Sequence, residues 1–312
     1  MYRFIYLLFV VFLFISNSNE VGAKIGWQHR NVESNSVIPN EMRVTYSDED
    51  VDIFNNYLQM MVGKKGLPFN ELIIETALYF RNVPYVASTL ESEEEHLIIN
   101  LRELDCTTFV ENVIALANTV KDEYPSFERF CDYLRLLRYR KGMVSGYTDR
   151  LHYFSDWIYE NEQAGFVRDM TKQAGGRPYS LNLSFMSSHP ESYPVLRSYP
   201  EFIEIIKKKE QEISHRNIYA MIPKADINKS QEIKSGDIVC FVTKIDGLDI
   251  THVGFVYIQG NVMTFVHASS SAKKVIVDLK SLQPYAESVK STIGIMIVRP
   301  LKNSFFIANV IK

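Results

Sequence analysis

The sequence predicts an α+β fold in which N-terminal helices pack on an antiparallel β-sheet. Helical periodicity dominates the first half of the chain, whereas short apolar stretches separated by turn residues follow Ile218. The dipeptide Gly260-Asn261 lies between two of these stretches and is typical of the tight turn of a β-hairpin. A run of helices followed by a run of strands is the pattern of α+β proteins. No internal repeat or low-complexity tract interrupts it.

Five helices are predicted ahead of the main group of strands. Ser47 with Asp50 resembles a capping pair at the start of the first helix, and Asp105 is a candidate N-cap for the third. In the third helix one apolar face is formed by Phe109, Val113, Leu116 and Ala117. The predicted helices cover about 47–63, 70–83, 106–120, 127–137 and 201–214.

Short apolar stretches predict the strands of the sheet. They cover 97–101, 219–222, 238–243, 252–258, 262–268, 275–278 and 293–298. The stretch 143–200 has no clear assignment, and long segments of this kind inside a compact domain are usually functional. Within it, the helical spacing of Tyr153 and Trp157 favours a core position for Trp157.

The N-terminus has the pattern of a secretory signal. Met1-Tyr2-Arg3 precedes an apolar run over 4–15, and Ala23 after Val21 fits a signal-peptidase site. The run is short for a membrane span of ~20 residues, so an uncleaved anchor is the weaker alternative. We therefore expect a signal peptide at 1–23, an extended segment at 24–46 and a single catalytic domain at 47–312. The domain would hold an insertion at about 125–217 and lie in a periplasm or outside the cell, without a transmembrane anchor.

The charge and the cysteine content indicate which partners are not expected and which thiol is a candidate reactive group. The formal net charge is -3, so nucleic acid and anionic membranes are not expected as main partners. The chain has three cysteines, an odd number for an exported protein. Cys131 and Cys240 lie in apolar patterns and are expected to be buried small hydrophobes or, alternatively, a pair. Cys106 is then left as the candidate reactive thiol.

Cys106 combines with two histidines into a predicted catalytic group. A cysteine in the first turn of a helix is expected to have a lowered pKa, because the helix N-terminus favours negative charge. His252 and His267 lie on the two strands joined by Gly260-Asn261, so pairing of these strands brings both imidazoles to one end of the hairpin. We expect Cys106 as nucleophile, His252 as base and His267 as the residue that orients His252. The backbone N–H of Cys106 would contribute to an oxyanion hole.

Other readings of these residues stay open. A lone cysteine or strand histidine is most often structural. A zinc site formed by Cys106, His252 and His267 lacks an evident fourth ligand, so neither a metal nor a cofactor is expected. Arg150 is a candidate clamp for a substrate carboxylate.

At this point the motifs resemble a known family. Their order along the chain is similar to that of the N-acetylmuramoyl-L-alanine amidase-like family, within the NlpC-type (papain-like) cell-wall cysteine peptidase superfamily. The resemblance extends from about Asn55 to Pro300. The motifs that carry it are Pro84-Tyr85-Val86, Asp105-Cys106, Gly236-Asp237, Thr251-His252-Val253-Gly254 and His267-Ala268.

The resemblance implies a papain-like core, a Cys-His-His triad and cleavage of amide bonds in bacterial peptidoglycan without a metal. Tyr85 matches a tyrosine that helps bind the oxyanion or substrate, although it can equally be a packed aromatic. Asp105 matches an aspartate that binds the free amine of a stem peptide, with helix capping as its alternative role. The sequence departs from the pattern at Thr107-Thr108, where relatives have Ser-Gly.

The expected function is therefore an exported cysteine amidohydrolase acting on peptidoglycan or muropeptides. Within this class, the alternative is a γ-D-glutamyl-diamino-acid endopeptidase acting on stem peptides. Acyl transfer involving lipids is less expected, because the histidine would then precede the cysteine in the chain. An inactive module that binds peptide or glycan is a further alternative. The sequence does not define an oligomeric state.

Overall fold

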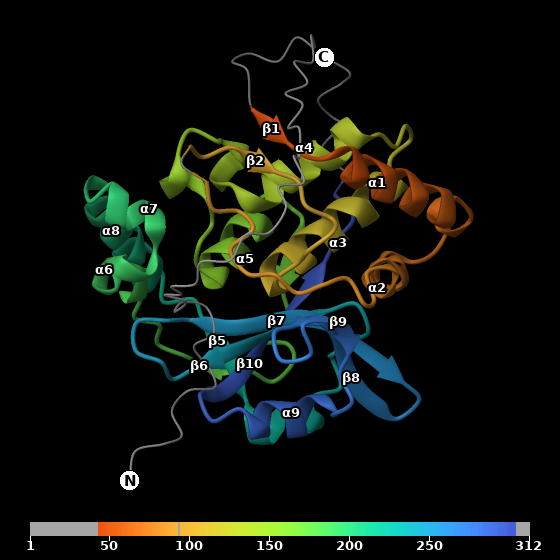
Figure 1. The fold of residues 1–312 in the computed structure, drawn as a ribbon. Coiled ribbons are helices and arrows are strands. Elements are labelled where there is room, and N and C mark those ends of the chain that lie inside the picture. The colour runs from red at the N-terminus through yellow and green to blue at the C-terminus, as the bar shows by residue number, and fades with distance from the viewer. Residues whose placement is uncertain (1–42, 93, 304–312) are drawn as a thin grey trace, which may run out of the picture.

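Most helices of the protein form one layer on an antiparallel β-sheet (Figure 1). The computed structural model describes residues 43–92 and 94–303, so the predicted signal peptide and most of the predicted segment 24–46 lie outside the described residues. The sheet has eight strands in the order β4-β5-β10-β6-β7-β8-β9, with β3 also paired to β10. In the described part of the chain, no helix combines the length and apolar character of a membrane span.

The helices are α1 (Asp48–Met61), α2 (Phe69–Tyr79), α3 (Cys106–Lys121), α4 (Phe127–Arg138), α5 (Phe154–Gln163), α6 (Phe185–Ser188), α7 (Pro194–Ser198), α8 (Glu201–His215) and α9 (Leu282–Ser288). Short 3-10 helices are η1 (Val62–Lys64), η2 (Arg140–Gly142), η3 (Tyr147–Asp149), η4 (Pro190–Ser192) and η5 (Lys224–Lys229). The strands are β1 (Val44–Thr45), β2 (Leu97–Ile98), β3 (Val167–Asp169), β4 (Arg177–Pro178), β5 (Ala220–Pro223), β6 (Ile238–Thr243), β7 (Ile250–Gln259), β8 (Val262–Ser269), β9 (Lys274–Val277) and β10 (Thr292–Pro300).

Most predicted elements are confirmed, although one predicted strand is shorter and several elements were not predicted. The five predicted helices correspond to α1, α2, α3, α4 and α8, and the side chains of Ser47 and Asp50 form the capping box of α1. The predicted strand 97–101 is reduced to β2, which pairs in parallel with β1 in a small separate sheet. Helix α9 was not predicted, because Pro284 discourages a helix assignment although proline is tolerated in a first turn.

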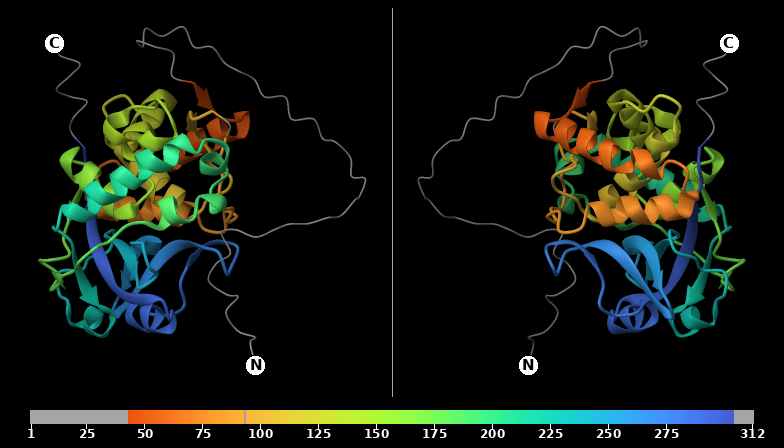
Figure 2. Two further views of the ribbon diagram at one scale, coloured as in Figure 1. Left: turned by 90° about the vertical axis from the view of Figure 1, so that its left-hand side faces the viewer. Right: turned by 90° about the vertical axis from the view of Figure 1, so that its right-hand side faces the viewer.

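Two apolar cores lie on the two faces of the sheet. On one face α3 packs against β7, and the rings of Phe109 and Phe255 meet edge to face at 5.7 Å. On the other face Phe241 and Phe265 pack with Leu282 of α9. Figure 2 shows the helical layer on one side of the sheet and α9 on the other. Alternation of side chains along each strand lets one strand serve both cores.

The predicted hairpin joins β7 to β8 through Gly260-Asn261. Gln259 pairs with Val262 directly across this turn, and Gly260 has a φ of 57°, a conformation that favours glycine. Pairing of β7 with β8 ends at Phe255, and beyond that point β8 continues along β9. The first half of β7 is therefore not paired with β8.

The middle of the chain contributes to both layers. Helix α4, at the start of the predicted insertion, packs on α3 through an ion pair in which Arg138 Nε lies 2.7 Å from Glu111 Oε2, with both side chains buried. Strands β3 and β4 extend the sheet, while α6, α7 and α8 form a group at the left of Figure 1. Trp157 of α5 is fully buried, as predicted.

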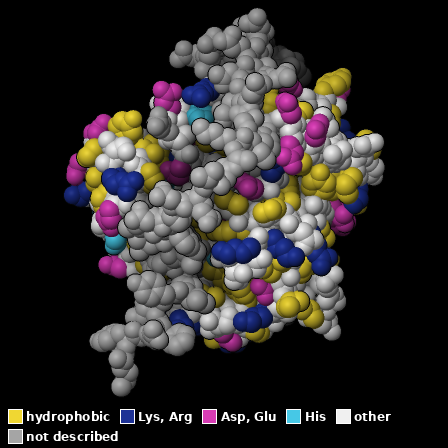
Figure 3. Space-filling model, viewed as in Figure 1, with side chains coloured by type: hydrophobic (Ala, Val, Ile, Leu, Met, Phe, Trp, Pro, Cys, Tyr) yellow, Lys and Arg dark blue, Asp and Glu magenta, His cyan; other side chains and the backbone are white. Residues whose placement is uncertain are grey.

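The charges on the surface are mixed. Figure 3 shows Lys and Arg side chains as well as Asp and Glu side chains on the visible face, and neither kind covers it. This mixture agrees with the small formal net charge of the chain.

Candidate active site

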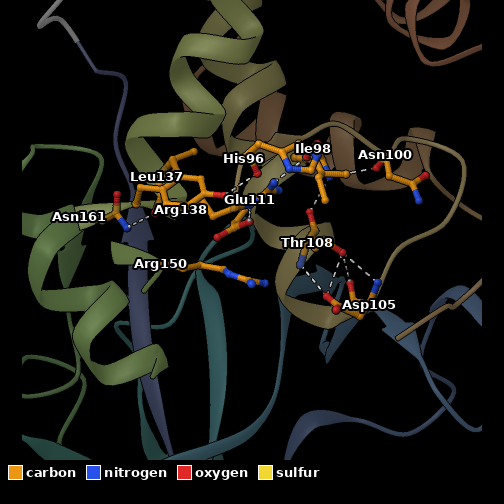
Figure 4. Close-up of polar contacts among 12 residues, drawn as sticks. His96, Ile98, Asn100, Asp105, Thr108, Glu111, Leu137, Arg138, Arg150 and Asn161 are labelled. Atoms are coloured by element: carbon orange, nitrogen blue, oxygen red, sulfur yellow. Dashed lines mark hydrogen bonds and ion pairs between the residues drawn. The ribbon is translucent and has the colours of Figure 1, made fainter. Parts of the chain in front are cut away.

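Cys106 is the first residue of α3, and the residues around it cap this helix. The Asp105 carboxylate accepts a hydrogen bond from the Thr108 N–H at 2.7 Å, and the Thr108 hydroxyl oxygen accepts one from the Asp105 N–H at 2.9 Å (Figure 4). Asp105 is thus the N-cap of α3. Thr108, at the position where the sequence departs from the family pattern, is its capping partner. Binding of a substrate amine by Asp105 stays a prediction.

The segment that carries Tyr85 is hydrogen-bonded to the chain just ahead of Cys106. The Leu104 N–H donates to the Pro84 carbonyl at 3.0 Å, and the Val86 N–H donates to the Leu104 carbonyl at 3.2 Å. Burial raises the pKa of Tyr85, and the neighbouring Cys106 and Asp105 raise it further. The phenol is therefore neutral and keeps a proton that it can donate. Its contact with an oxyanion or substrate stays a prediction.

The two histidines are in direct contact. His252 Nε2 lies 2.6 Å from His267 Nδ1, and the two ring planes are nearly perpendicular at 82°. On its other side, His267 Nε2 lies 3.2 Å from Asp278 Oδ2. Three polar side chains from β7, β8 and the end of β9 therefore form one hydrogen-bonded chain.

Asp278 was not identified from the sequence, although a signal for it existed. It follows β9 directly, and its N–H donates to the Phe265 carbonyl at 2.9 Å. In an antiparallel pair, residues that lie opposite each other point to the same face. Pairing the predicted strand 262–268 with the predicted strand 275–278 would have placed this carboxylate on the same face as His267.

Aromatic rings surround the histidine pair. Phe265 stacks on His267 with centroids 4.2 Å apart, Phe241 stacks on His252 at 6.0 Å, and Tyr285 of α9 packs against both imidazoles. This burial, together with the nearby His267, holds the pKa of His252 well below its ordinary value. His252 is consequently a neutral imidazole that can accept a proton. Tyr285 was also missed, because it belongs to the unpredicted α9.

Cys106 and His252 line the same cavity, which has a volume of about 150 Å³. The residue after His252, Val253, directs its backbone N–H at the Cys106 sulfur. The unassigned stretch 143–200 supplies part of the lining. Its contributions are Leu151, His152, Tyr153, Phe154, Met186 and Tyr193.

The protonation state of the thiol differs from the prediction. Burial and the Asp105 carboxylate raise the pKa of Cys106 to about 12, although hydrogen bonds from the Val253 N–H and the Thr107 side chain act in the opposite direction. The expectation of a lowered pKa was therefore wrong. Loss of water and a negatively charged N-cap outweigh the favourable helix N-terminus. The resting site holds a neutral thiol and a neutral imidazole, so attack by sulfur requires a base.

Arg150 is paired within the protein. Its guanidinium lies 3.1 Å from Glu91 Oε1 and 3.0 Å from Glu95 Oε2, and its side chain is only 8% exposed. The residue is absent from the lining of the cavity that holds Cys106. Neighbouring His152 lines that cavity, with its Nε2 atom 2.8 Å from the Tyr147 carbonyl. The role of Arg150 in substrate binding stays a prediction.

The remaining cysteines are buried free thiols. Cys131 lies in α4 and Cys240 in β6, and they form no disulfide with each other or with Cys106. Within the described ranges 43–92 and 94–303, no group of three His, Cys, Asp or Glu side chains is arranged to hold a metal ion.

Comparisons with known proteins relate this architecture to amidases. A family model described as N-acetylmuramoyl-L-alanine amidase-like (AmiA-like) matches residues 75–295. Among solved structures, an N-acetylmuramoyl-L-alanine amidase from Bacteroides uniformis has 37% identity and a TM-score of 0.71, with 75% of this chain and 99% of that chain covered. A Bacteroides fragilis protein with a provisional xylanase name has 37% identity and a TM-score of 0.68, with 72% and 99% covered.

A more distant likeness concerns the fold alone. A Legionella pneumophila protein of the DUF1460 family has 22% identity and a TM-score of 0.61, with 81% of this chain and 94% of that chain covered. No curated protein matches the chain.

The fold and the site define a class of α+β protein in which a thiol at a helix start shares a cavity with one member of a hydrogen-bonded histidine pair. Within that class, the chain belongs to the N-acetylmuramoyl-L-alanine amidase-like family, whose model matches well over half of its length.

Proposed function

We propose that the protein is an exported cysteine amidohydrolase that cleaves an amide bond in bacterial peptidoglycan. The observation that carries the proposal is the shared cavity of Cys106 and His252, where the His252 Nε2 atom is already bonded to His267 and the Nδ1 atom is left for the thiol. The amidase name of the family and of the Bacteroides uniformis relative supports this substrate class. A papain-like core of the NlpC type and export by the N-terminal signal belong to the same proposal.

The reaction begins with transfer of the Cys106 thiol proton to Nδ1 of His252. The sulfur attacks the amide carbonyl carbon, and the C–N bond breaks as the imidazolium returns the proton to the leaving amine. A thioester remains on Cys106. Water then loses a proton to His252 and attacks the thioester, the C–S bond breaks, and the protein regains its thiol as the carboxylic acid product leaves.

The negative charge that develops on the carbonyl oxygen needs hydrogen-bond donors. The backbone N–H of Cys106, at the first turn of α3, is one candidate. The neutral phenol of Tyr85, next to Cys106 and Asp105, is the second. Because the Cys106 thiol is uncharged at rest, these donors and the base act together as the negative charge moves from sulfur to oxygen.

The first experiment compares the wild type with Cys106→Ala on purified peptidoglycan and measures newly released amines. We expect the rate to fall by at least ~10³-fold, because the nucleophile is lost. Cys131→Ala is the matched control, since Cys131 is a buried thiol in α4 outside the cavity lining. Cleavage by Cys106→Ala at the wild-type rate would reject Cys106 as the nucleophile.

Mass spectrometry of the products identifies the bond. Free muramyl groups together with intact stem peptides mean cleavage of the lactyl-L-alanine amide. Shortened stem peptides with a new diamino-acid N-terminus mean γ-D-glutamyl endopeptidase activity instead.

Reaction with a thiol reagent does not separate the enzyme from an inactive binding module. The pKa of Cys106 is raised to about 12, so slow labelling is expected even in an active enzyme.

A further inference from the structure

We propose that Asp278 is a positioning residue that fixes the tautomers of both histidines and so leaves the Nδ1 atom of His252 free to accept a proton. The structure provides a chain of contacts from this carboxylate to His267 and on to His252. The role as a base rests on the proposed function, whereas the tautomers themselves are a property of the resting protein.

Both oxygens of the Asp278 carboxylate have a hydrogen-bond partner, and its backbone is bonded separately. One oxygen lies 3.2 Å from His267 Nε2, and the other accepts the Lys280 N–H at 2.8 Å. The backbone of Asp278 is bonded to Phe265 through its N–H and to the Thr264 hydroxyl through its carbonyl. Its side chain is 14% exposed and the side chain of His267 is 2% exposed, so water competes little for this contact.

The charge of Asp278 decides which atom of His267 carries the proton. Burial raises the pKa of this carboxyl, but the hydrogen bonds from His267 and from the Lys280 N–H lower it more, so the group is ionised. An ionised carboxylate can only accept a hydrogen bond. His267 therefore carries its proton on Nε2.

The tautomer of His267 in turn decides that of His252. A neutral imidazole has one N–H, so the Nδ1 atom of His267 is an acceptor once Nε2 is the donor. The 2.6 Å contact then requires His252 to donate from Nε2. The single lone pair left on His252 is on Nδ1, the ring nitrogen that is not bonded to His267. The opposite tautomer of His267 would present a lone pair to the Asp278 carboxylate, which is unfavourable.

The test compares the wild type with Asp278→Ala, Asp278→Asn and Thr264→Val. Long-range 1H–15N spectra of the histidine side chains report which ring nitrogen is protonated. Signals of His252 and His267 are assigned from their loss in His252→Gln and His267→Gln. Thr264→Val is the matched control, because it removes the hydroxyl that bonds to the Asp278 and Lys280 carbonyls and leaves the imidazole contacts in place.

We expect both imidazoles of the wild type and of Thr264→Val to be protonated on Nε2. Asp278→Ala should give a mixture of tautomers and lower kcat by ~10–100-fold with little change in KM, the usual range for residues that support a reactive group indirectly. Asp278→Asn should restore much of the wild-type tautomer distribution and of kcat, since its amide oxygen can accept the same hydrogen bond.

Protonation of His267 on Nδ1 in the wild type would overturn the inference without any variant. Unchanged tautomers in a folded Asp278→Ala would overturn it as well. The spectra need no substrate, so a shift in tautomers supports the inference even where peptidoglycan is not cleaved, and failure of the proposed function remains a separate result.

Discussion

Close packing around the histidine pair leaves no room for a side chain at Gly254. A Cβ atom at this position would lie 2.7 Å from the Val266 carbonyl oxygen and 2.9 Å from both His267 Cβ and the Phe265 ring. These distances are too short for real contacts, and two of the three involve atoms that cannot swing away. The glycine two residues after His252 therefore allows β7 to approach β8 where His267 is positioned.

Gly254→Ala should displace His267 and lower the free energy of unfolding by ~1–3 kcal/mol, the usual effect of an overpacked core. The rate of amide cleavage should fall as well, because the contact between the imidazoles is disturbed. Urea unfolding and the peptidoglycan assay measure the two effects.

Gly63→Ala is the control for Gly254→Ala, because a Cβ at Gly63 meets nothing within 4 Å. If both alanine variants behave alike, the tight packing around Gly254 does not matter.

Helix α8 supports the wall of the cavity through the carboxylate of Glu210. Glu210 is 1% exposed, and its carboxylate accepts hydrogen bonds from the Tyr153 hydroxyl at 2.6 Å and from the Ser187 N–H at 3.1 Å. The Tyr153 hydroxyl in turn accepts from the N–H of Met186 at 2.9 Å. Tyr153 and Met186 both line the cavity with Cys106. One buried carboxylate thus joins α8 to two segments of the wall.

Glu210→Ala should lower the free energy of unfolding by ~2–4 kcal/mol, because buried donors lose their acceptor. The loosened wall should also raise KM for peptidoglycan more than it lowers kcat. Glu210→Gln should stay close to the wild type, since its amide oxygen still accepts the Tyr153 hydrogen bond.

Glu204→Ala is the control for the helix itself, because Glu204 is exposed on α8. An effect of Glu204→Ala as large as that of Glu210→Ala would mean that helix propensity, and not the bracing contact, is responsible.

Stability at low pH is a property of the whole molecule, because buried histidines and buried carboxyl groups change it in opposite directions. Burial and the neighbouring Arg150 lower the pKa of His152 to about 3, and burial lowers the pKa of His252 as well. Below their ordinary pKa these histidines bind protons in the unfolded chain but not in the folded one. Their contribution to the free energy of unfolding therefore decreases as the pH is lowered. Burial raises the pKa values of Glu111 and Asp249, which acts in the opposite direction.

The share of His152 can be isolated by mutation. Between about pH 7.5 and about pH 5, the wild type should lose ~2 kcal/mol more unfolding free energy than His152→Gln, from 1.36 kcal/mol for each pH unit below the ordinary pKa. Urea unfolding at the two pH values gives the difference. His215→Gln, on the exposed end of α8, should leave the pH dependence unchanged. Equal pH dependence in the wild type and His152→Gln would show that His152 is not buried in its neutral form.

The features that depend on near neighbours in the chain could be predicted from the amino-acid sequence. Periodicity and capping residues defined α1 and α3, and Gly260-Asn261 defined the hairpin that brings His252 to His267. Each of these signals lies within one helix or one pair of adjacent strands.

The protonation states and partners of the groups found in this way depend on the packing of the whole chain. Burial and the Asp105 carboxylate keep the thiol of Cys106 neutral, and Arg150 is bound to carboxylates 55 and 59 residues earlier in the chain. Asp278 reaches His267 because β9 pairs with β8. Burial and long-range charge pairing depend on how the whole chain packs, so a motif can identify a reactive residue but not its protonation state.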